Sequence, residues 1–127
     1  GVLGVGVELA GLVGATLYQQ TRYLDPIEQA NKYAAILKHD LACDYVIALS
    51  HLGFRYKNDK VSDHTLAGAS RDIDLIIGGH THTFLEEPVA VANAAGRAVQ
   101  IAQAGFAGSW VGRLDVYFEK RSKRYWS

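Results

Sequence analysis

The 127-residue sequence predicts an α/β fold, or α+β by some schemes, in which parallel strands are joined through helices. Three short apolar runs, at 2–7, 44–50 and 72–79, have the length and composition of buried strands. Helical patterns separate these runs, and strand, helix and strand in this order imply parallel strands with right-handed crossovers. Strands this apolar are expected to be covered on both faces of the sheet.

The most clearly marked element is a helix over 25–40. Asp25 is a good N-cap, Pro26 suits the first helical position, and Glu28 completes a capping box. Apolar residues then recur at helical spacing, which predicts one buried stripe along the helix. The stripe consists of Ile27, Ala30, Ala34 and Leu37.

Two further segments of the first half carry weaker signals. Residues 8–23 are rich in glycine and threonine without a clear period, so we expect a loop that contains at most a short helix. Residues 62–70 predict a second short helix, with Ser62 or Asp63 as its cap.

The texture of the sequence changes after residue 84. Residues 88–105 alternate between apolar and polar positions around Asn-Ala-Ala-Gly, which predicts an antiparallel hairpin. Alternation returns in 112–119 and predicts a final strand. We therefore expect one globular unit over 1–119, followed by a basic tail or linker over 120–127.

Composition gives no support to nucleic-acid binding or to a membrane span. Lys plus Arg and Asp plus Glu both number 13, so net charge offers no argument for nucleic-acid binding. No apolar run reaches the ~18 residues of a membrane span. Cys43 is the only cysteine and is expected to be a small buried hydrophobe. The chain has no Met and opens on strand-like sequence, so we expect a piece of a longer protein.

Each of two parallel-type strands runs into histidine. The strand at 44–50 is followed by His51, and the strand at 72–79 is followed by His80 and His82. Sites in open α/β sheets gather at the carboxyl ends of strands, and neighbouring strands lie ~4.8 Å apart. The three imidazoles are therefore predicted metal ligands at one edge of the sheet.

The spacing within the pair supports this interpretation. Residues i and i+2 of extended chain lie roughly 6–7 Å apart, so His80 and His82 suit two different ions of a metal pair. Gly78 and Gly79 would let the backbone turn sharply before them. The other two histidines, His39 near a helix C-terminus and His64 at a polar helix start, are assigned no site.

Several motifs together resemble a known family. Ser-His-Leu-Gly at 50–53 precedes IDLIIGGHTHTFL at 73–85, and the likeness extends to 99–119 and back to 1–9. This ordered set resembles the C-terminal half of the calcineurin-like metallophosphoesterase domain of the 5'-nucleotidase and UDP-sugar hydrolase family. The resemblance implies part of a four-layer α/β/β/α sandwich.

The resemblance also implies residue roles. His51 and His80 would bind one divalent metal and His82 a second, with Zn, Mn, Fe or Co as the metal. A metal-activated water would attack a nucleotide or another phosphate monoester. It further implies a periplasmic or extracellular location, with no residue of this chain assigned to the substrate.

Other parts of the family pattern are missing from this sequence. It contains no Asp-x-His, no Gly-Asp and no Asn-His, which in the family supply the remaining ligands and the catalytic histidine. No catalytic residue is therefore assigned in this chain, and we expect the parent protein to be the enzyme and this chain alone to be inactive. The missing N-terminal half should leave an apolar sheet face exposed, which favours self-association.

Nearby acids and other motifs offer less. Asp63, Glu86 and Glu87 are further candidate ligands, but solvated surface acids are the commoner case. Glycines at 4 and 6 lack the third glycine of a dinucleotide fingerprint, and Ser50 lacks a Gly-x-Ser-x-Gly elbow. The alternative function is a non-catalytic three-histidine module for metal binding or assembly.

Overall fold

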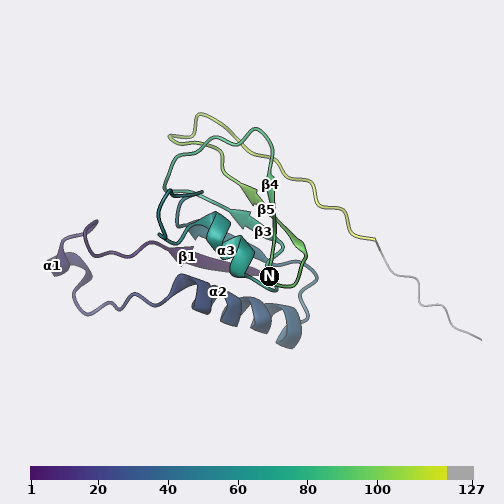
Figure 1. Ribbon diagram of the computed structural model, residues 1–127, viewed down its shortest axis with the longest axis horizontal. Helices are drawn as coiled ribbons and strands as arrows, with labels where there is room; N and C mark the ends of the chain where they lie inside the picture. Colours follow the sequence, from purple (N-terminus) through teal and green to yellow (C-terminus); the bar gives the residue numbers. More distant parts are fainter. Residues whose placement is uncertain (120–127) are drawn as a thin grey trace, which may run out of the picture.

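The computed structural model describes residues 1–119, and the predicted basic tail at 120–127 lies outside them. Its centre is one five-stranded sheet with the order β1-β2-β3-β5-β4 (Figure 1). The strands are β1 Val2–Gly6, β2 Ile47–His51, β3 Leu75–Ile77, β4 Val89–Ala92 and β5 Ala98–Ala102.

The strand directions confirm the predicted α/β class. The neighbouring strands β1, β2, β3 and β5 all pair in parallel, and β4 pairs antiparallel with β5 to form the predicted hairpin. The carboxyl ends of β2 and β3 consequently lie at the same edge of the sheet. The hairpin turn is closed by Asn93, whose N–H donates to the carbonyl of Arg97 at 2.8 Å.

The helix predicted over 25–40 is present. It comprises α2 Pro26–Ala35 and a π-helical turn, η1 Ile36–Asp40. Asp25 caps it by accepting a hydrogen bond from the Glu28 N–H at 2.8 Å. This bond satisfies one of the donors that a helix start leaves free, so the predicted cap is confirmed. Among the described residues the Glu28 side chain makes no return bond to Asp25, so the predicted capping box is incomplete.

The two shorter helices also fall where the sequence indicated. Ser62 caps α3, Asp63–Ala69, and exchanges hydrogen bonds with Thr65, which stands in for the usual Glu or Gln of a capping box. The other helix is α1, Ala15–Tyr18, on the long loop that follows β1 (Figure 1). No helix within residues 1–119 is long and apolar enough to cross a membrane.

The core lies between one face of the sheet and the helices α2 and α3. Ile76 and Ile101 of the central strands are fully buried there, against Ala34 of α2 and Leu66 of α3. Cys43 packs at the margin of this cluster, as a small apolar side chain is expected to. Burial of such side chains removes roughly 25 cal/mol of unfavourable free energy per Å².

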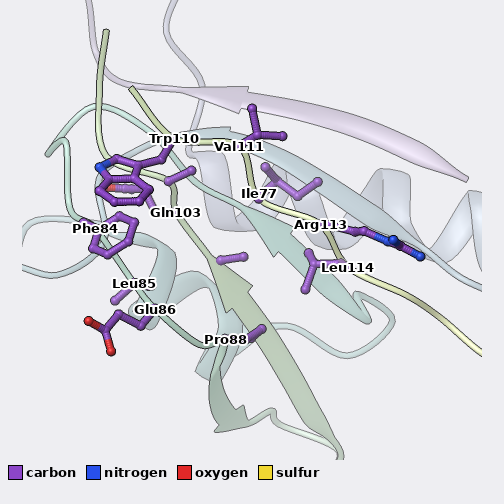
Figure 2. A pocket seen from close by; sticks show the side chains of 13 residues that line it. Ile77, Phe84, Leu85, Glu86, Pro88, Gln103, Trp110, Val111, Arg113 and Leu114 are labelled. Carbon is purple, nitrogen blue, oxygen red and sulfur yellow. The ribbon is translucent and has the colours of Figure 1, made fainter. Parts of the chain in front are cut away.

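On the opposite face, the expectation of an exposed apolar sheet face holds, and the expectation that both faces are covered does not. Leu49 and Ile77 point to that face and remain 49% and 41% exposed. Both α2 and α3 pack on the core side. On the second face, residues 84–88 and the C-terminal segment of the described chain lie over part of the sheet. Trp110 and Leu114 from that segment line a groove of about 320 Å³ with Ile77 (Figure 2). The expected self-association through this face stays a prediction.

The final strand predicted over 112–119 is absent, because this segment forms no strand within the described residues. It passes over the sheet face instead of along a sheet edge, where Leu114 touches the groove and Phe118 packs edge-on against Tyr45 at 5.9 Å between ring centroids. A segment above a sheet meets side chains but no free backbone N–H and C=O groups, so the alternating pattern finds no ladder to join.

Candidate metal centre

Two of the three predicted ligands lie side by side. His51 ends β2, and His80 follows β3, its parallel neighbour. Their ring centroids are 5.0 Å apart with an interplanar angle of 69°. The convergence of strand ends that the sequence indicated therefore holds for this pair.

His82 is turned elsewhere. Its ring stacks on Phe106, with centroids 5.2 Å apart and an interplanar angle of 19°. Within residues 1–119, no three His, Cys, Asp or Glu side chains are grouped so that they could hold a metal ion. The structure thus presents a two-histidine pair with a third histidine nearby in sequence, and the metal role of all three stays a prediction.

The backbone of the histidine loop differs from the extended chain that the spacing argument assumed. His80 and His82 have φ angles of 71° and 54°, in the left-handed region that most side chains avoid. Such residues cost on the order of 1–3 kcal/mol each and persist where the surroundings dictate them. The distance expected for extended i and i+2 residues therefore does not apply here.

The glycines before the loop provide space and not a left-handed turn. A Cβ on Gly78 would lie 2.1 Å from Oδ2 of Asp63, and a Cβ on Gly79 would lie 3.3 Å from Nδ1 of His51. Neither glycine has a positive φ. The sequence analysis expected these glycines to permit a sharp turn, whereas the left-handed conformations lie at His80 and His82.

Asp63 is a correction to the view that the nearby acids are solvated. Its residue exposure is 0%, and Oδ1 accepts a hydrogen bond from the Ser50 hydroxyl at 2.5 Å. Its other oxygen, Oδ2, is buried without a hydrogen-bond partner among the described residues. Burial raises the pKa of this carboxyl to about 6, although the Ser50 hydrogen bond opposes the shift. Glu86 and Glu87 are exposed, as expected.

Electrostatics favour a neutral His80. Burial lowers the pKa of its imidazole, and the positive charges of His51, Lys60 and His82 lower it further. Lys60 itself lies over the ring of Tyr56, with Nζ 4.7 Å from the centroid. Because metal ions bind the neutral imidazole, this environment keeps His80 in the form that a ligand needs.

The remaining histidines lie apart from the pair, in agreement with the sequence analysis. His39 stands at the C-terminal turn of η1 and contacts the Asp72 carboxylate at 3.1 Å, beyond the amino end of β3. His64 occupies the first turn of α3. Neither belongs to the pair formed by His51 and His80.

Sequence reasoning missed one residue of this site, Gln103. It is only 3% exposed and contacts the histidine loop directly. A signal was available, since Val99, Ile101 and Gln103 are spaced two apart and share the buried pattern of β5. A polar residue that continues the core-facing side of a strand needs hydrogen-bond partners, so it points to an organised polar site.

The sequence is similar to segments of several longer proteins. No protein-family model matches the chain. An apyrase of Aedes aegypti is 31% identical over 95% of this chain and 25% of its own length. A snake venom 5'-nucleotidase of Naja atra is 29% identical over 96% of the chain and 26% of its length. The trifunctional nucleotide phosphoesterase protein YfkN of Bacillus subtilis is 35% identical over 76% of the chain and 6% of its length.

A solved structure supports the same relationship. The 5'-nucleotidase precursor from Thermus thermophilus superposes with a TM-score of 0.56 at 31% identity, over 65% of this chain and 17% of that protein. The chain spans about a quarter or less of the length of these relatives. In sequence and in fold, it is related to 5'-nucleotidases and apyrases and matches one segment of their length.

Proposed function

We propose that this chain supplies the histidine side of a divalent-metal site in a hydrolase that acts on nucleotides or related phosphate monoesters. The observation that carries the proposal is the His51–His80 pair, 5.0 Å between ring centroids at the carboxyl ends of two adjacent parallel strands. The names of the relatives, 5'-nucleotidase, apyrase and nucleotide phosphoesterase, support the substrate class.

The residues fit a borderline divalent cation. Imidazole nitrogens suit Zn, Mn, Fe and Co alike, and the lowered pKa keeps His80 unprotonated. His51 and His80 would bind one ion, and His82 would reach a second ion only by leaving the ring of Phe106. A bound divalent ion would supply Lewis-acid polarisation of a phosphoryl oxygen and charge stabilisation in the transition state.

The other residues around the pair would shape the site. Lys60, whose charge acts on His80, adds positive potential near the pair, which would favour a bound phosphate group. The Ser50 hydroxyl donates to Asp63 and accepts from the Leu52 N–H at 3.2 Å, so it supports the backbone that follows His51 and is not assigned as a nucleophile. Asp63 is fully buried and hydrogen-bonded to Ser50, so we do not propose it as a ligand.

We further propose that turnover needs residues that this chain does not contain. The sequence has no Gly-Asp, Asn-His or Asp-x-His, and the relatives are several times as long. Two histidines leave at least half of the positions around a metal without a protein ligand. The parent protein would be the enzyme, and a location outside the cytoplasm is proposed from relatives such as the snake venom 5'-nucleotidase.

The test is metal binding by the purified chain. Titration with Co²⁺, followed by its visible absorption, should show a stoichiometric site that His80→Ala abolishes. His39→Ala is the matched control, because it removes an imidazole from the opposite end of the sheet, and it should bind as the wild type does. His82→Ala should weaken binding less than His80→Ala, since its ring is stacked on Phe106.

The same samples distinguish the remaining possibilities. Equal Co²⁺ binding by wild type and His80→Ala would contradict the proposed site. Hydrolysis of a nucleoside monophosphate by the isolated chain with Mn²⁺, lost in His80→Ala, would show that the chain completes its own site. Binding without turnover, also on addition of the corresponding N-terminal part of a relative, would favour the non-catalytic metal-binding module.

A further inference from the structure

The side chain of Gln103 contacts each residue that flanks the two histidines of the loop. Its Nε2 donates to the Gly79 carbonyl at 2.9 Å, and its Oε1 accepts from the Thr81 hydroxyl at 3.2 Å and from the Thr83 N–H. Residues 79, 81 and 83 alternate with His80 and His82. The buried Gln103 amide therefore hydrogen-bonds to residues 79, 81 and 83. It makes no hydrogen bond to His80 or His82, which lie between them.

A second link joins this loop to the loop that follows His51. The Thr81 hydroxyl also accepts a hydrogen bond from the Phe54 N–H at 2.9 Å and contacts the Thr83 hydroxyl at 3.0 Å. If Thr81 donates to Gln103 and Thr83 donates to Thr81, each hydroxyl proton and each lone pair of Thr81 is used once. The path Gln103–Thr81–Phe54 thus connects the loops after β3 and β2.

The close packing around Thr81 shows that this connection is built tightly. Gly53, next to Phe54, has φ +94°, and a Cβ there would lie 2.6 Å from Cγ2 of Thr81. On the other side, the backbone of the loop is bonded to the strand region, because Leu85 N–H donates to the Gln103 carbonyl at 3.0 Å. Little room remains for either loop to shift without breaking these contacts.

We propose that Gln103 is a positioning residue that holds His80 in its left-handed conformation and, through Thr81, sets its placement against His51. The inference rests on the proposed metal-binding function of these histidines. Left-handed non-glycine residues need surroundings that dictate them, and the Gln103 contacts are those surroundings. Residues that orient metal ligands from behind typically change metal affinity by about 10- to 100-fold when removed.

The decisive comparison is Gln103→Ala against Asn93→Ala. Asn93 is a second buried amide of the same hairpin, 6% exposed, and its Oδ1 accepts from the N–H groups of Ala95 and Arg97 at the other end of β5. Both variants lose a buried amide that organises a loop. Gln103→Ala should weaken Co²⁺ binding at least about tenfold, and Asn93→Ala should leave it within about threefold at a comparable loss of thermal stability.

A second pair of variants removes less of the buried side chain, in case Gln103→Ala does not fold. Thr81→Val removes the hydroxyl that joins the two loops, and Thr81→Ser keeps it. We expect Thr81→Val to weaken Co²⁺ binding and to speed amide hydrogen exchange at Phe54, with both properties restored in Thr81→Ser. The exchange measurement needs no metal, so it judges the connection between the loops by itself.

The outcomes separate the two proposals. If the wild-type chain binds no Co²⁺, the proposed metal site is wrong, and this inference fails with it even where exchange at Phe54 confirms the link. If the wild type binds Co²⁺ and Gln103→Ala binds equally well, the metal site stands and Gln103 is only a structural residue. Equal loss of affinity in Gln103→Ala and Asn93→Ala would also overturn the inference, because general destabilisation would then explain both.

Discussion

The two ends of the sheet differ in how completely their polar side chains are hydrogen-bonded. At the amino end, Asp74 accepts hydrogen bonds from Lys38 at 3.1 Å and from the Val46 N–H at 2.8 Å, and Asp72 contacts both His39 and Arg97. Ordinary turn geometry and complementary charges satisfy these groups. This end has the character of a surface built for stability.

The carboxyl end retains strain and an unsatisfied group. His80 and His82 have left-handed backbone conformations, and Oδ2 of the buried Asp63 has no hydrogen-bond partner among the described residues. Among residues 1–119, the histidine that contacts a carboxylate is His39, at the other end, 3.1 Å from Asp72. Left-handed residues also occur outside the histidine loop, at Gln19, Ala42 and Ala107, so the unsatisfied buried carboxylate beside the histidine loop distinguishes the carboxyl end better than backbone strain does.

The largest effect is expected when a methyl group is added at Gly78, at the carboxyl end of the sheet. The same change at Gly96, in the hairpin turn, is the comparison. Gly78→Ala would place a Cβ 2.1 Å from the buried Asp63 carboxylate and 3.0 Å from Nε2 of Gln103, so we expect a loss of about 2–3 kcal/mol. Gly96→Ala, in the hairpin turn at φ +74° with no atom within 4 Å, should cost only ~1 kcal/mol of backbone strain. Chemical denaturation of both variants measures the two losses of unfolding free energy. Equal losses would contradict the expected contrast between the two ends of the sheet.

The second effect concerns pH. The folded-state pKa of Asp63 is raised to about 6, above its unfolded value of roughly 3.9, so the folded protein binds the extra proton between these values. This contribution to stability is present at low pH and is lost as pH rises through 6. Relative to Asp63→Asn, the wild type should gain about 1 kcal/mol between pH 7 and pH 5.

Unfolding midpoints of wild type and Asp63→Asn at both pH values test this expectation. The other carboxylates are shared by the two proteins, so their titration cancels in the difference. A difference that does not change with pH, or that changes in the opposite direction, would show that Asp63 is ionised in the folded state at pH 5.

The smallest effect is expected at the amino end. Asp72→Asn removes the charge that faces His39 and Arg97, whose side chains are 65% and 51% exposed. Exposed ion pairs typically contribute less than about 1 kcal/mol, and salt screens them. A loss well above this value, undiminished in high salt, would mean that the amino end is as finely organised as the histidine end.

Sequence alone predicted the elements whose signals are local. The Asp25-Pro26 start, the period of α2, the three parallel strands and the hairpin around Asn93 were all indicated by adjacent residues. The position of His51 and His80 at one edge followed from strand order. These features depend on short-range sequence and on general rules of parallel sheets.

The features that were missed depend on partners distant in the chain. The left-handed φ angles of His80 and His82 occur in a loop whose neighbouring residues bond to Gln103, far along the sequence, so the Gly-Gly-His-x-His pattern could not indicate them. In the sequence, Asp63 has the signature of an acid at an exposed helix start. Its burial depends on tertiary packing that includes the contact with Ser50, thirteen residues earlier. The alternation at 112–119 says nothing about whether an edge strand is near.

The register of the sheet has a consequence for the order in which the molecule assembles. In the hairpin, Ala92 pairs with Ala98, six positions on (98 − 92), but Val2 of β1 pairs with Ile47, forty-five positions on (47 − 2). Closing the longer loop costs about 2 kcal/mol more chain entropy, so the hairpin has a head start during folding. The His51–His80 pair depends on β2 and β3, where Leu49 pairs with Ile77, twenty-eight positions on (77 − 49), so we expect it to form after the hairpin and before β1 is added.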